Sequence, residues 1–451
     1  MRSLLLASSL LVLLPACAGS YERQTRSSLD ARPRPVPRDD DADPEAPSAS
    51  FDGSYPRYVG YALEHNPDLR ARYAEWEAAV DGIDTMRSLP NPVVRYSLYL
   101  RHVETRVGPQ RHKLGFSQSF PWPTQLSAGA ASASLSASAA EQRLDGEALA
   151  VTERVGSAYW RLWLVDRTKG VLEDQQKLLE AVEEAARARL EVGSASLADL
   201  TQVSLRRSRL IDRIGALTEE RHRLEAALRR ALSVTPATAL PVAEAPPEVA
   251  LPSESDASLR QAARKNPRVS ALELLAESRR EAADRAFAAG LPGFSVGVDW
   301  IETGPAMATG VADSGKDAVM LNFGIDIPIW RHVHSAEEAR AKSESRAFLA
   351  QRDAAEDEMV AGTEVALADV RDAFRRVRLY RDTLLPQAET VIESVLGGYQ
   401  VGEVGLAAVL MGQDDMLELS LGLHRAQADH AIAWARLEAL VGRKVAAGEG
   451  A

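Results

Sequence analysis

The side chains best suited to bind a metal ion gather at one place in the sequence, just ahead of a long helical pattern. His332, His334, Glu337 and Glu338 supply imidazole and carboxylate groups, which are common zinc ligands. Carboxylates in the first turn of a helix also stabilise the helix start without any metal. Because a helix is predicted to begin here, we favour the second explanation and expect neither a metal site nor a cofactor.

Motifs for enzymatic chemistry are missing from the sequence. It contains no Walker loop and no HExxH pair, and each of these would indicate a reaction class. We therefore expect that the protein is not an enzyme. The formal net charge of −11 also argues against a nucleic-acid partner, because such partners select basic surfaces.

The single cysteine, Cys17, ends a segment typical of exported proteins. Arg2 precedes an apolar run over residues 4–14, which is too short for a transmembrane helix. The letters LPAC at residues 14–17 resemble the bacterial lipoprotein processing box. This resemblance implies cleavage before Cys17 and its acylation, for example with palmitate, and Ala18 implies delivery to the outer membrane. A plain signal peptide with an incidental cysteine is the alternative.

Four short runs alternate between apolar residues and small or polar ones, which is the period of a β-strand. They cover residues 94–101, 114–123, 294–300 and 319–328. Strands of this kind suit a membrane barrel with a watery lumen, but a half-buried sheet of a soluble protein shows the same alternation. The apolar residues expected on the outward face are Val94, Tyr96, Leu98, Leu100, Phe116, Phe120, Phe294, Val296, Val298, Trp300, Phe323, Ile325 and Ile327.

Long segments with little glycine follow each strand pair. Residues 124–191 would extend for about 100 Å as a helix, which is typical of a coiled coil and not of a compact domain. The next segment, up to about Leu232, repeats leucine at heptad spacing, so the two are predicted to form an antiparallel hairpin with Gly193 at its turn. The pattern recurs over residues 335–396, where Pro386 predicts a kink, and is followed by a last heptad-patterned helix.

The order of these segments repeats at an offset of about 200 residues, as the Asn-Pro pairs at Asn66 and Asn266 illustrate. An internal duplication of this kind indicates a repeat architecture. The acidic cluster Asp39, Asp40, Asp41 and Asp43 is expected to be solvated linker. The predicted organisation is a lipoprotein signal peptide over 1–17, a disordered tether over 18–56, a first structural repeat over 57–234, a linker over 235–255, a second repeat over 256–443 and a disordered tail over 444–451.

The predicted fold is mainly α with a small β part, in which four transmembrane strands accompany two long antiparallel coiled-coil hairpins. Four strands cannot close a barrel, and an open sheet edge cannot face lipid. Three identical chains would supply a 12-strand β-barrel, continued by a ring of helices that forms an α-barrel. Proline ends a strand ladder and tryptophan suits the membrane interface. The residues expected at the barrel-to-helix junction are Pro121, Trp122, Pro123, Pro328 and Trp330.

Taken in order, these motifs resemble the TolC-like outer-membrane efflux family. The resemblance rests on the cysteine box, the duplicated Asn-Pro pairs, the Pro-Asn-Pro turn at residues 90–92, the Phe-Pro-Trp-Pro run at residues 120–123, and two Val-Gly turns. It implies a homotrimer that serves as the exit duct of a tripartite pump. The implied partners are a periplasmic adaptor (membrane fusion) protein and a proton-driven inner-membrane transporter of the resistance-nodulation-division type. Heavy-metal cations or small toxic compounds are the implied cargo.

The resemblance also implies where partners and a gate would lie. Small residues at the hairpin turns allow close backbone approach, and in the family these turns meet the adaptor. The implied adaptor-docking tips are Val192, Gly193, Ser194, Ala195, Ser196, Val401, Gly402, Glu403, Val404 and Gly405. The candidate gate residues are Asp199, Asp414 and Asp415. Asp199 could equally be the acid of a capping box with Ser196, and the positions that match it in the second repeat, Ala408 and Met411, are not acidic.

Two alternatives share part of this pattern. A duct for type I protein secretion would have the same fold and a different inner-membrane partner. A lipid-anchored coiled-coil scaffold without a pore would keep the helices but would not conduct ions.

Overall fold

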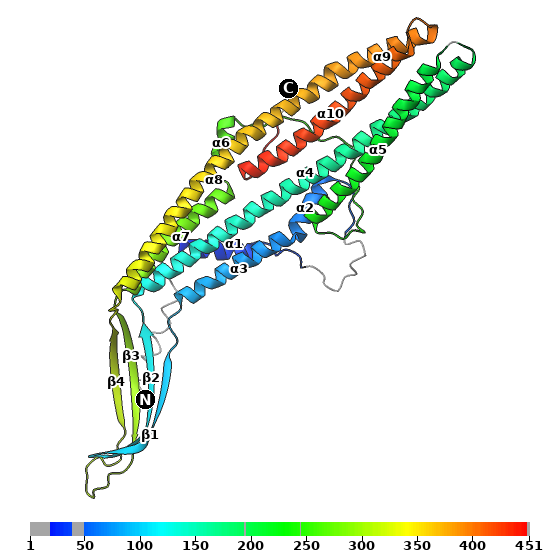
Figure 1. The fold of residues 1–451 in the computed structure, drawn as a ribbon. Helices are drawn as coiled ribbons and strands as arrows, with labels where there is room; N and C mark the ends of the chain where they lie inside the picture. The colour runs from blue at the N-terminus through cyan, green and yellow to red at the C-terminus, as the bar shows by residue number, and fades with distance from the viewer. Residues whose placement is uncertain (1–18, 38–48, 194, 244, 449–451) are drawn as a thin grey trace. The chain divides into compact units, whose positions relative to one another are not determined.

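The computed structural model describes residues 19–37, 49–193, 195–243 and 245–448. It is predominantly helical with one small sheet, as predicted (Figure 1). Cys17, the acidic cluster of residues 39–43 and Ser194 lie outside the described residues. The helices are α1 Ser20–Ala31, α2 Tyr55–His65, α3 Pro67–Arg87, α4 Pro123–Glu191, α5 Leu197–Leu232, α6 Asp256–Ala263, α7 Pro267–Ala289, α8 Arg331–Leu379, α9 Leu385–Val401 and α10 Leu406–Val441.

The chain divides into two compact units that do not coincide with the two sequence repeats. The strand unit holds Ala74–Gln142, Ser270–Asp353 and the described part of Met1–Pro33. The hairpin unit holds the described parts of Arg34–Tyr73, Arg143–Val269 and Ala354–Ala451. Each unit takes segments from both repeats, because segments pack across the two repeats as well as within their own copy.

The sheet of the strand unit contains four antiparallel strands in the order β1-β2-β3-β4. Their bounds are β1 Val93–Thr105, β2 Gly108–Phe120, β3 Gly293–Thr303 and β4 Ala318–Asp326. The central pairing, β2 with β3, joins the two repeats. β1 and β2 are longer than predicted, since the polar residues between them continue the strands up to a tight turn before Gly108. Gly108 has φ +129°, and a Cβ there would clash with the carbonyl oxygen of Gly304.

Helix α1 corrects the prediction of a disordered tether over 18–56. Glu22, only 2% exposed, pairs with Arg87 and with Arg26 (3.1 Å). Trp76 Nε1 donates to Thr25 Oγ1 (3.1 Å). Further along, Phe51 stacks on a tyrosine of α2 at 4.4 Å between ring centroids. The described parts of this segment are polar in composition, but specific ion pairs and hydrogen bonds order them.

In the hairpin unit, the duplicated Asn-Pro pairs cap α3 and α7 in the same way. Asn66 Oδ1 accepts from the backbone N–H of Asp68 (2.8 Å), and its Nδ2 donates to the carbonyl of Ala231 (3.0 Å). Asn266 likewise accepts from a backbone N–H two residues on (2.9 Å) and donates to the carbonyl of Ala439 (2.9 Å). Both asparagines are 3% exposed. Each therefore ties the start of a short helix to the end of a hairpin.

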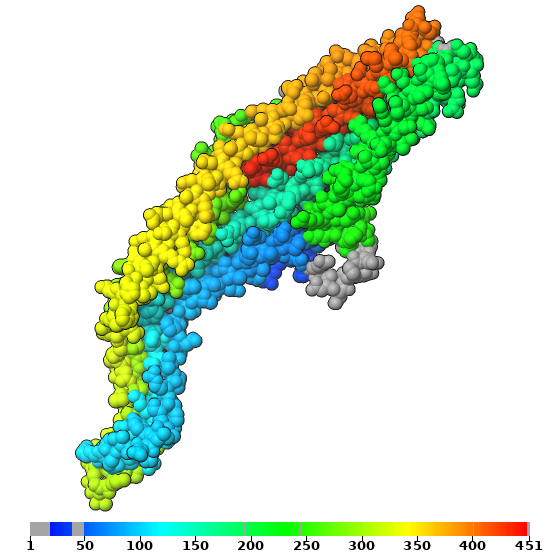
Figure 2. Space-filling model, in the orientation of Figure 1, coloured from blue at the N-terminus to red at the C-terminus, as the bar shows by residue number. Residues whose placement is uncertain are grey.

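The two helical hairpins, α4–α5 and α9–α10, pack on each other toward their tips (Figures 1 and 2). Leucines at heptad spacing form the shared core, as the sequence predicts. The predicted kink before Pro386 takes the form of a π-helical turn over Tyr380–Leu384, because proline lacks an N–H and clashes with the carbonyl four residues earlier. The buried core residues near the tips are Leu172, Leu179, Val203, Leu210, Leu406 and Leu410.

The C-terminal segment corrects a second prediction, since residues 444–448 of the expected disordered tail are ordered. Ala447 pairs with Pro252 in an antiparallel bridge, and Val445 is 6% exposed. Arg443 binds Glu254 through both terminal nitrogens at 2.8 and 2.7 Å. Burial of one apolar side chain and backbone pairing with the linker hold this segment in place. Residues 449–451 lie outside the described part.

None of the helices in the described part of the chain combines the length and the apolar character needed to span a membrane.

Candidate functional site

One face of the sheet is a continuous apolar surface. In the register, Phe116 lies opposite Val298, which lies opposite Leu321. The predicted outward residues that the register pairs share this face, whereas Leu100 lies in the register break of β1 and Ile327 lies beyond the end of β4. These side chains are exposed in the single chain; for example, Phe323 is 74% exposed and Leu100 is 89% exposed. A patch of this size is too large to be left in water on a soluble monomer, and an alternating apolar face is typical of strands in lipid.

The opposite face of the sheet is small and polar. Asp299 on β3 pairs with Lys113 Nζ on β2 (2.6 Å) and accepts from Asn322 Nδ2 on β4 (2.8 Å). Glycines alternate with these groups. A Cβ on Gly115 would lie 2.4 Å from an oxygen of Asp299, and one on Gly324 would lie 2.3 Å from Ser295 Oγ. This polar face, which we call the inner face, therefore combines hydrogen-bonded charged groups with small side chains. Such a surface suits a water-filled passage.

Both edges of the sheet are open. Within the described residues, β1 pairs only with β2 and β4 pairs only with β3. An open edge carries a row of unpaired N–H and C=O groups, which are a template for pairing with another chain. In lipid such groups would each cost several kcal/mol if left unpaired.

The Pro-Trp residues lie where strands pass into helices. β2 ends at Phe120, and after Pro121 and Trp122 the first residue of α4 is Pro123, a position where its missing N–H has no consequence. Trp122 is half-buried and packs against Phe294, with 6.2 Å between ring centroids. On the other side, Pro328 and Trp330 separate β4 from α8, and Trp330 is 68% exposed.

Both hairpin turns have the form expected of the tips. Gly193 and Gly402 adopt φ of +74° and +84°, in the left-handed region that favours glycine. The valines before them, Val192 and Val401, are 78% and 72% exposed. Two apolar side chains are thus presented at the ends of hairpins with open space around each glycine. Of the other predicted tip residues, Ser196 and Gly405 are the N-caps of α5 and α10, and Ala195, Glu403 and Val404 lie in the turns.

The three candidate gate acids have different surroundings. Asp199 closes the capping box: its carboxylate accepts from Ser196 N (3.0 Å) and its own N–H donates to Ser196 Oγ (3.1 Å). The hydrogen bond from the Ser196 backbone lowers the pKa of Asp199. Asp414 on α10 forms an ion pair with Arg206 on α5, and Arg206 also donates to the carbonyl of Leu410 (3.1 Å). Asp415 is exposed.

The role of Arg206 in joining the two hairpins could not be predicted from the sequence. This residue is one of many arginines on helical segments, and its partner lies 208 positions away. Near it, the Arg189 guanidinium lies over the ring of Tyr399 at 4.6 Å. Arg206 and Arg189 therefore link the first hairpin to the second close to the tips.

The histidine and glutamate cluster at the start of α8 does not converge on one point. Within the described residues no group of three or more His, Cys, Asp or Glu side chains is placed to hold a metal ion. His334 approaches Glu337 at 3.9 Å, whereas Glu338 pairs with Lys342. His332 packs edge-on against the ring of Trp330. The expectation that Glu337 and Glu338 stabilise the helix start is wrong, because α8 begins at Arg331 and has no acidic residue in its first turn.

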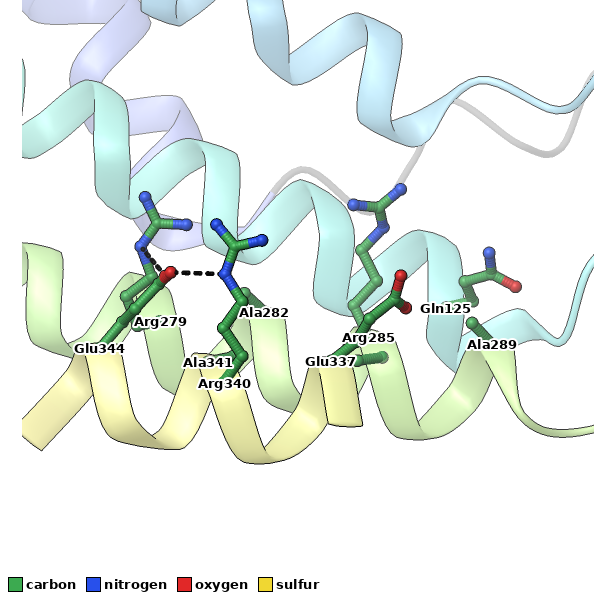
Figure 3. A pocket seen from close by; sticks show the side chains of 10 residues that line it. Gln125, Arg279, Ala282, Arg285, Ala289, Glu337, Arg340, Ala341 and Glu344 are labelled. Atoms are coloured by element: carbon green, nitrogen blue, oxygen red, sulfur yellow. Dashed lines mark hydrogen bonds and ion pairs between the residues drawn. The ribbon is translucent and has the colours of Figure 1, made fainter. Parts of the chain in front are cut away.

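Glu337 also lines a hollow of about 350 Å³ between α4, α7 and α8 (Figure 3). Glu344 bridges two arginines there, at 3.4 Å from Arg279 Nε and 2.9 Å from Arg340 Nε. Charges of both signs line this hollow, so it has no clear preference for a cation or an anion.

Comparison with known proteins is consistent with this geometry. The family described as outer membrane efflux protein matches twice, over residues 59–234 and 258–443. No curated protein matches the sequence. Solved structures do: VceC, an outer membrane protein of Vibrio cholerae, has 17% identity and a TM-score of 0.69 over 86% of this chain and 96% of that one.

Two outer-membrane channels are similar to the same extent. OprN has 16% identity and a TM-score of 0.71 over 89% of this chain and 94% of its own. MtrE of Neisseria gonorrhoeae, solved in its open state, has 17% identity and a TM-score of 0.68 over 87% and 89%. At these identities the likeness concerns the fold. The two family matches cover most of the sequence, so the chain belongs to the outer membrane efflux protein family of TolC-like transport proteins.

Proposed function

We propose that three copies of this chain form one passive exit duct through the outer membrane. The observation that carries the proposal is the open four-stranded sheet, apolar on one face and polar on the other, with both edges unpaired in the described residues. Joining β1 of one copy to β4 of the next satisfies these edges. Three sheets then make a 12-strand barrel, an even number within the known range, and its Trp122 and Trp330 positions mark the interface on the periplasmic side.

The hairpins extend the duct into the periplasm and end in the partner-binding tips. Exposed Val192 and Val401 beside left-handed glycines offer small apolar knobs to a helical partner, and we assign that partner as a periplasmic adaptor. An inner-membrane transporter of the proton-driven resistance-nodulation-division type would deliver cargo, with heavy-metal cations or small toxic compounds as the proposed class. Acylation of Cys17 would add a second membrane attachment to the barrel, since several acyl chains anchor a protein stably.

The gate in this proposal is the link between hairpins near the tips. Arg206 holds Asp414 and the carbonyl of Leu410 at the same time, so separation of the two hairpins must break a charge-assisted contact. Asp415 lies next to this pair and Asp199 holds the start of α5. Separation of the hairpins would widen the periplasmic end of the duct.

Single-channel recording tests the proposal. Purified full-length protein in planar bilayers should give discrete conductance steps that grow in frequency with protein concentration. Protein that binds vesicles without conducting would contradict the duct and favour the scaffold. A cell-based test uses a strain lacking this chain: efflux of the accumulated toxic compound should return with the wild type and not with a version lacking residues 93–120.

A further inference from the structure

A cavity in the hairpin unit has no role in the duct as proposed. It has a volume of about 510 Å³, within the range of sites that bind drug-sized molecules. The start of α2, the middle of α4, the linker around Pro246 and the C-terminal part of α10 line it. All of these segments belong to one compact unit.

Aromatic rings form its walls. Tyr55 packs against Tyr159 at 5.5 Å and against Trp160 at 5.6 Å, and the latter two rings meet edge-on at 4.8 Å. On α10, Trp434 lies 5.7 Å from His430. Faces of tyrosine and tryptophan carry negative electrostatic potential, so a ring-lined cavity attracts cations as well as apolar groups.

His430 lines the cavity from α10. His430 is 1% exposed, and its Nε2 lies 2.7 Å from the carbonyl oxygen of Ala250. Since a carbonyl can only accept, Nε2 carries the hydrogen, which leaves Nδ1 as a bare lone pair. Nδ1 is buried and has no hydrogen-bond partner within the described residues. Burial lowers the pKa of His430, which favours the neutral ring.

The formal charge of the lining is negative. Glu438 uses one oxygen to accept from Val445 N (3.0 Å) and Trp434 Nε1 (3.3 Å), and Glu248 lines the cavity near the linker. No lysine or arginine is among the described residues that line it. Two carboxylates in the lining attract a cation and repel an anion.

We propose that this cavity binds an organic cation with aromatic or bulky apolar substituents. The rings of Tyr55, Trp160 and Trp434 would enclose its apolar groups, and Glu438 would neutralise its charge. This inference concerns binding to the hairpin unit and does not depend on ion conduction by the sheet.

Isothermal titration of the full-length protein in detergent tests it with tetraphenylphosphonium as the probe. Tetraphenylborate has the same shape and the opposite charge, and micelles without protein provide the blank. We expect saturable binding of the cation with one site per chain, and no saturable binding of the anion. Equal binding of both ions, or no binding above the micelle blank because a second copy or another segment fills the cavity, would overturn the proposal.

A conservative variant identifies the site. Glu438→Gln keeps the oxygen that accepts from Val445 and removes the charge, so the fold should persist while affinity for the cation falls about tenfold. Trp160→Ala should weaken binding by a similar factor through loss of a ring face. Glu418→Gln, on an exposed part of the same helix, is the matched control and should bind as the wild type does. If Glu438→Gln and Trp160→Ala both bind like the wild type, the cavity is not the site.

Discussion

Replacement of Phe323 by arginine distinguishes a sheet that faces lipid from one that faces water. Phe323 lies near the middle of β4 on the apolar face, opposite Val296, and is 74% exposed in the single chain. If water covers this face, an exposed substitution should change the free energy of unfolding by about 0.5 kcal/mol or less. If lipid covers it, arginine near the bilayer midplane costs about 2–4 kcal/mol per chain, hence roughly 6–12 kcal/mol for three chains in one barrel.

The same strand provides the matched control. Met320 is 40% exposed and lies on the inner face, directly opposite Asp299. Met320→Arg introduces the same charge three residues away, next to a carboxylate and toward the proposed lumen, where we expect a cost below about 1 kcal/mol.

The assay is folding into lipid vesicles. Urea-unfolded protein is diluted into vesicles, and the folded fraction is measured by tryptophan fluorescence and by resistance of the oligomer to unheated detergent gels. Phe323→Arg should shift the urea midpoint strongly downward or abolish insertion, while Met320→Arg should behave like the wild type. Equal tolerance of the two arginines would refute the assignment of the faces, and equal failure of both would show that the inner face is not aqueous.

Three further predictions concern the helical part of the chain. Arg206→Ala should favour the open duct by about 1 kcal/mol per chain, seen as a higher open fraction in bilayers than for the wild type or Arg206→Lys; an unchanged open fraction would remove Arg206 from the gate. The hydrogen bonds from Arg443 lower the pKa of Glu254 from 4.5 to about 2, so this contact stabilises the C-terminal segment above pH 4.5 and is lost as the pH falls toward 2. The protection factor of the Val445 amide, which compares its exchange with that of an unstructured amide at the same pH, should fall over that range, and Glu254→Gln should show a low protection factor at every pH. Glu22→Ala should lower the free energy of local opening of α1 by roughly 2 kcal/mol, so amide exchange should be faster throughout this helix. If the amides of α1 exchange as in the wild type, the ion pairs of Glu22 do not hold α1 in place.

The strands and hairpins could be predicted from the sequence because each leaves a periodic pattern of apolar residues. Alternation along residues 94–100 and 294–300 reflects one apolar environment on one side of the sheet, and the observed register places both sets on a common face. Leucines at heptad spacing likewise indicate a packed helix–helix interface, and Gly193 indicates a turn that needs a positive φ. In each case one local pattern has one physical reason.

The segments that were not predicted are held by interactions that leave no periodic pattern in the sequence. Helix α1 has the sequence SYERQTRSSLDA, which offers no apolar stripe, and its partner Arg87 lies far along the chain. Residues 444–448 are ordered largely by backbone pairing with the linker, which leaves little trace in side-chain types. The Arg206–Asp414 pair joins different repeats and could not be found from one sequence, because any arginine on a polar helix face looks the same.

In the proposed duct, one chain holds a third of a barrel and takes the rest from identical copies. Native mass spectrometry of the protein released from detergent micelles measures the number of chains directly. We expect a species of three chains that survives gentle activation. This species should be lost when Tyr96 and Leu98, on the edge strand β1, are both replaced by proline so that β1 cannot pair. A stable single chain that inserts into vesicles with the same sheet would contradict the account.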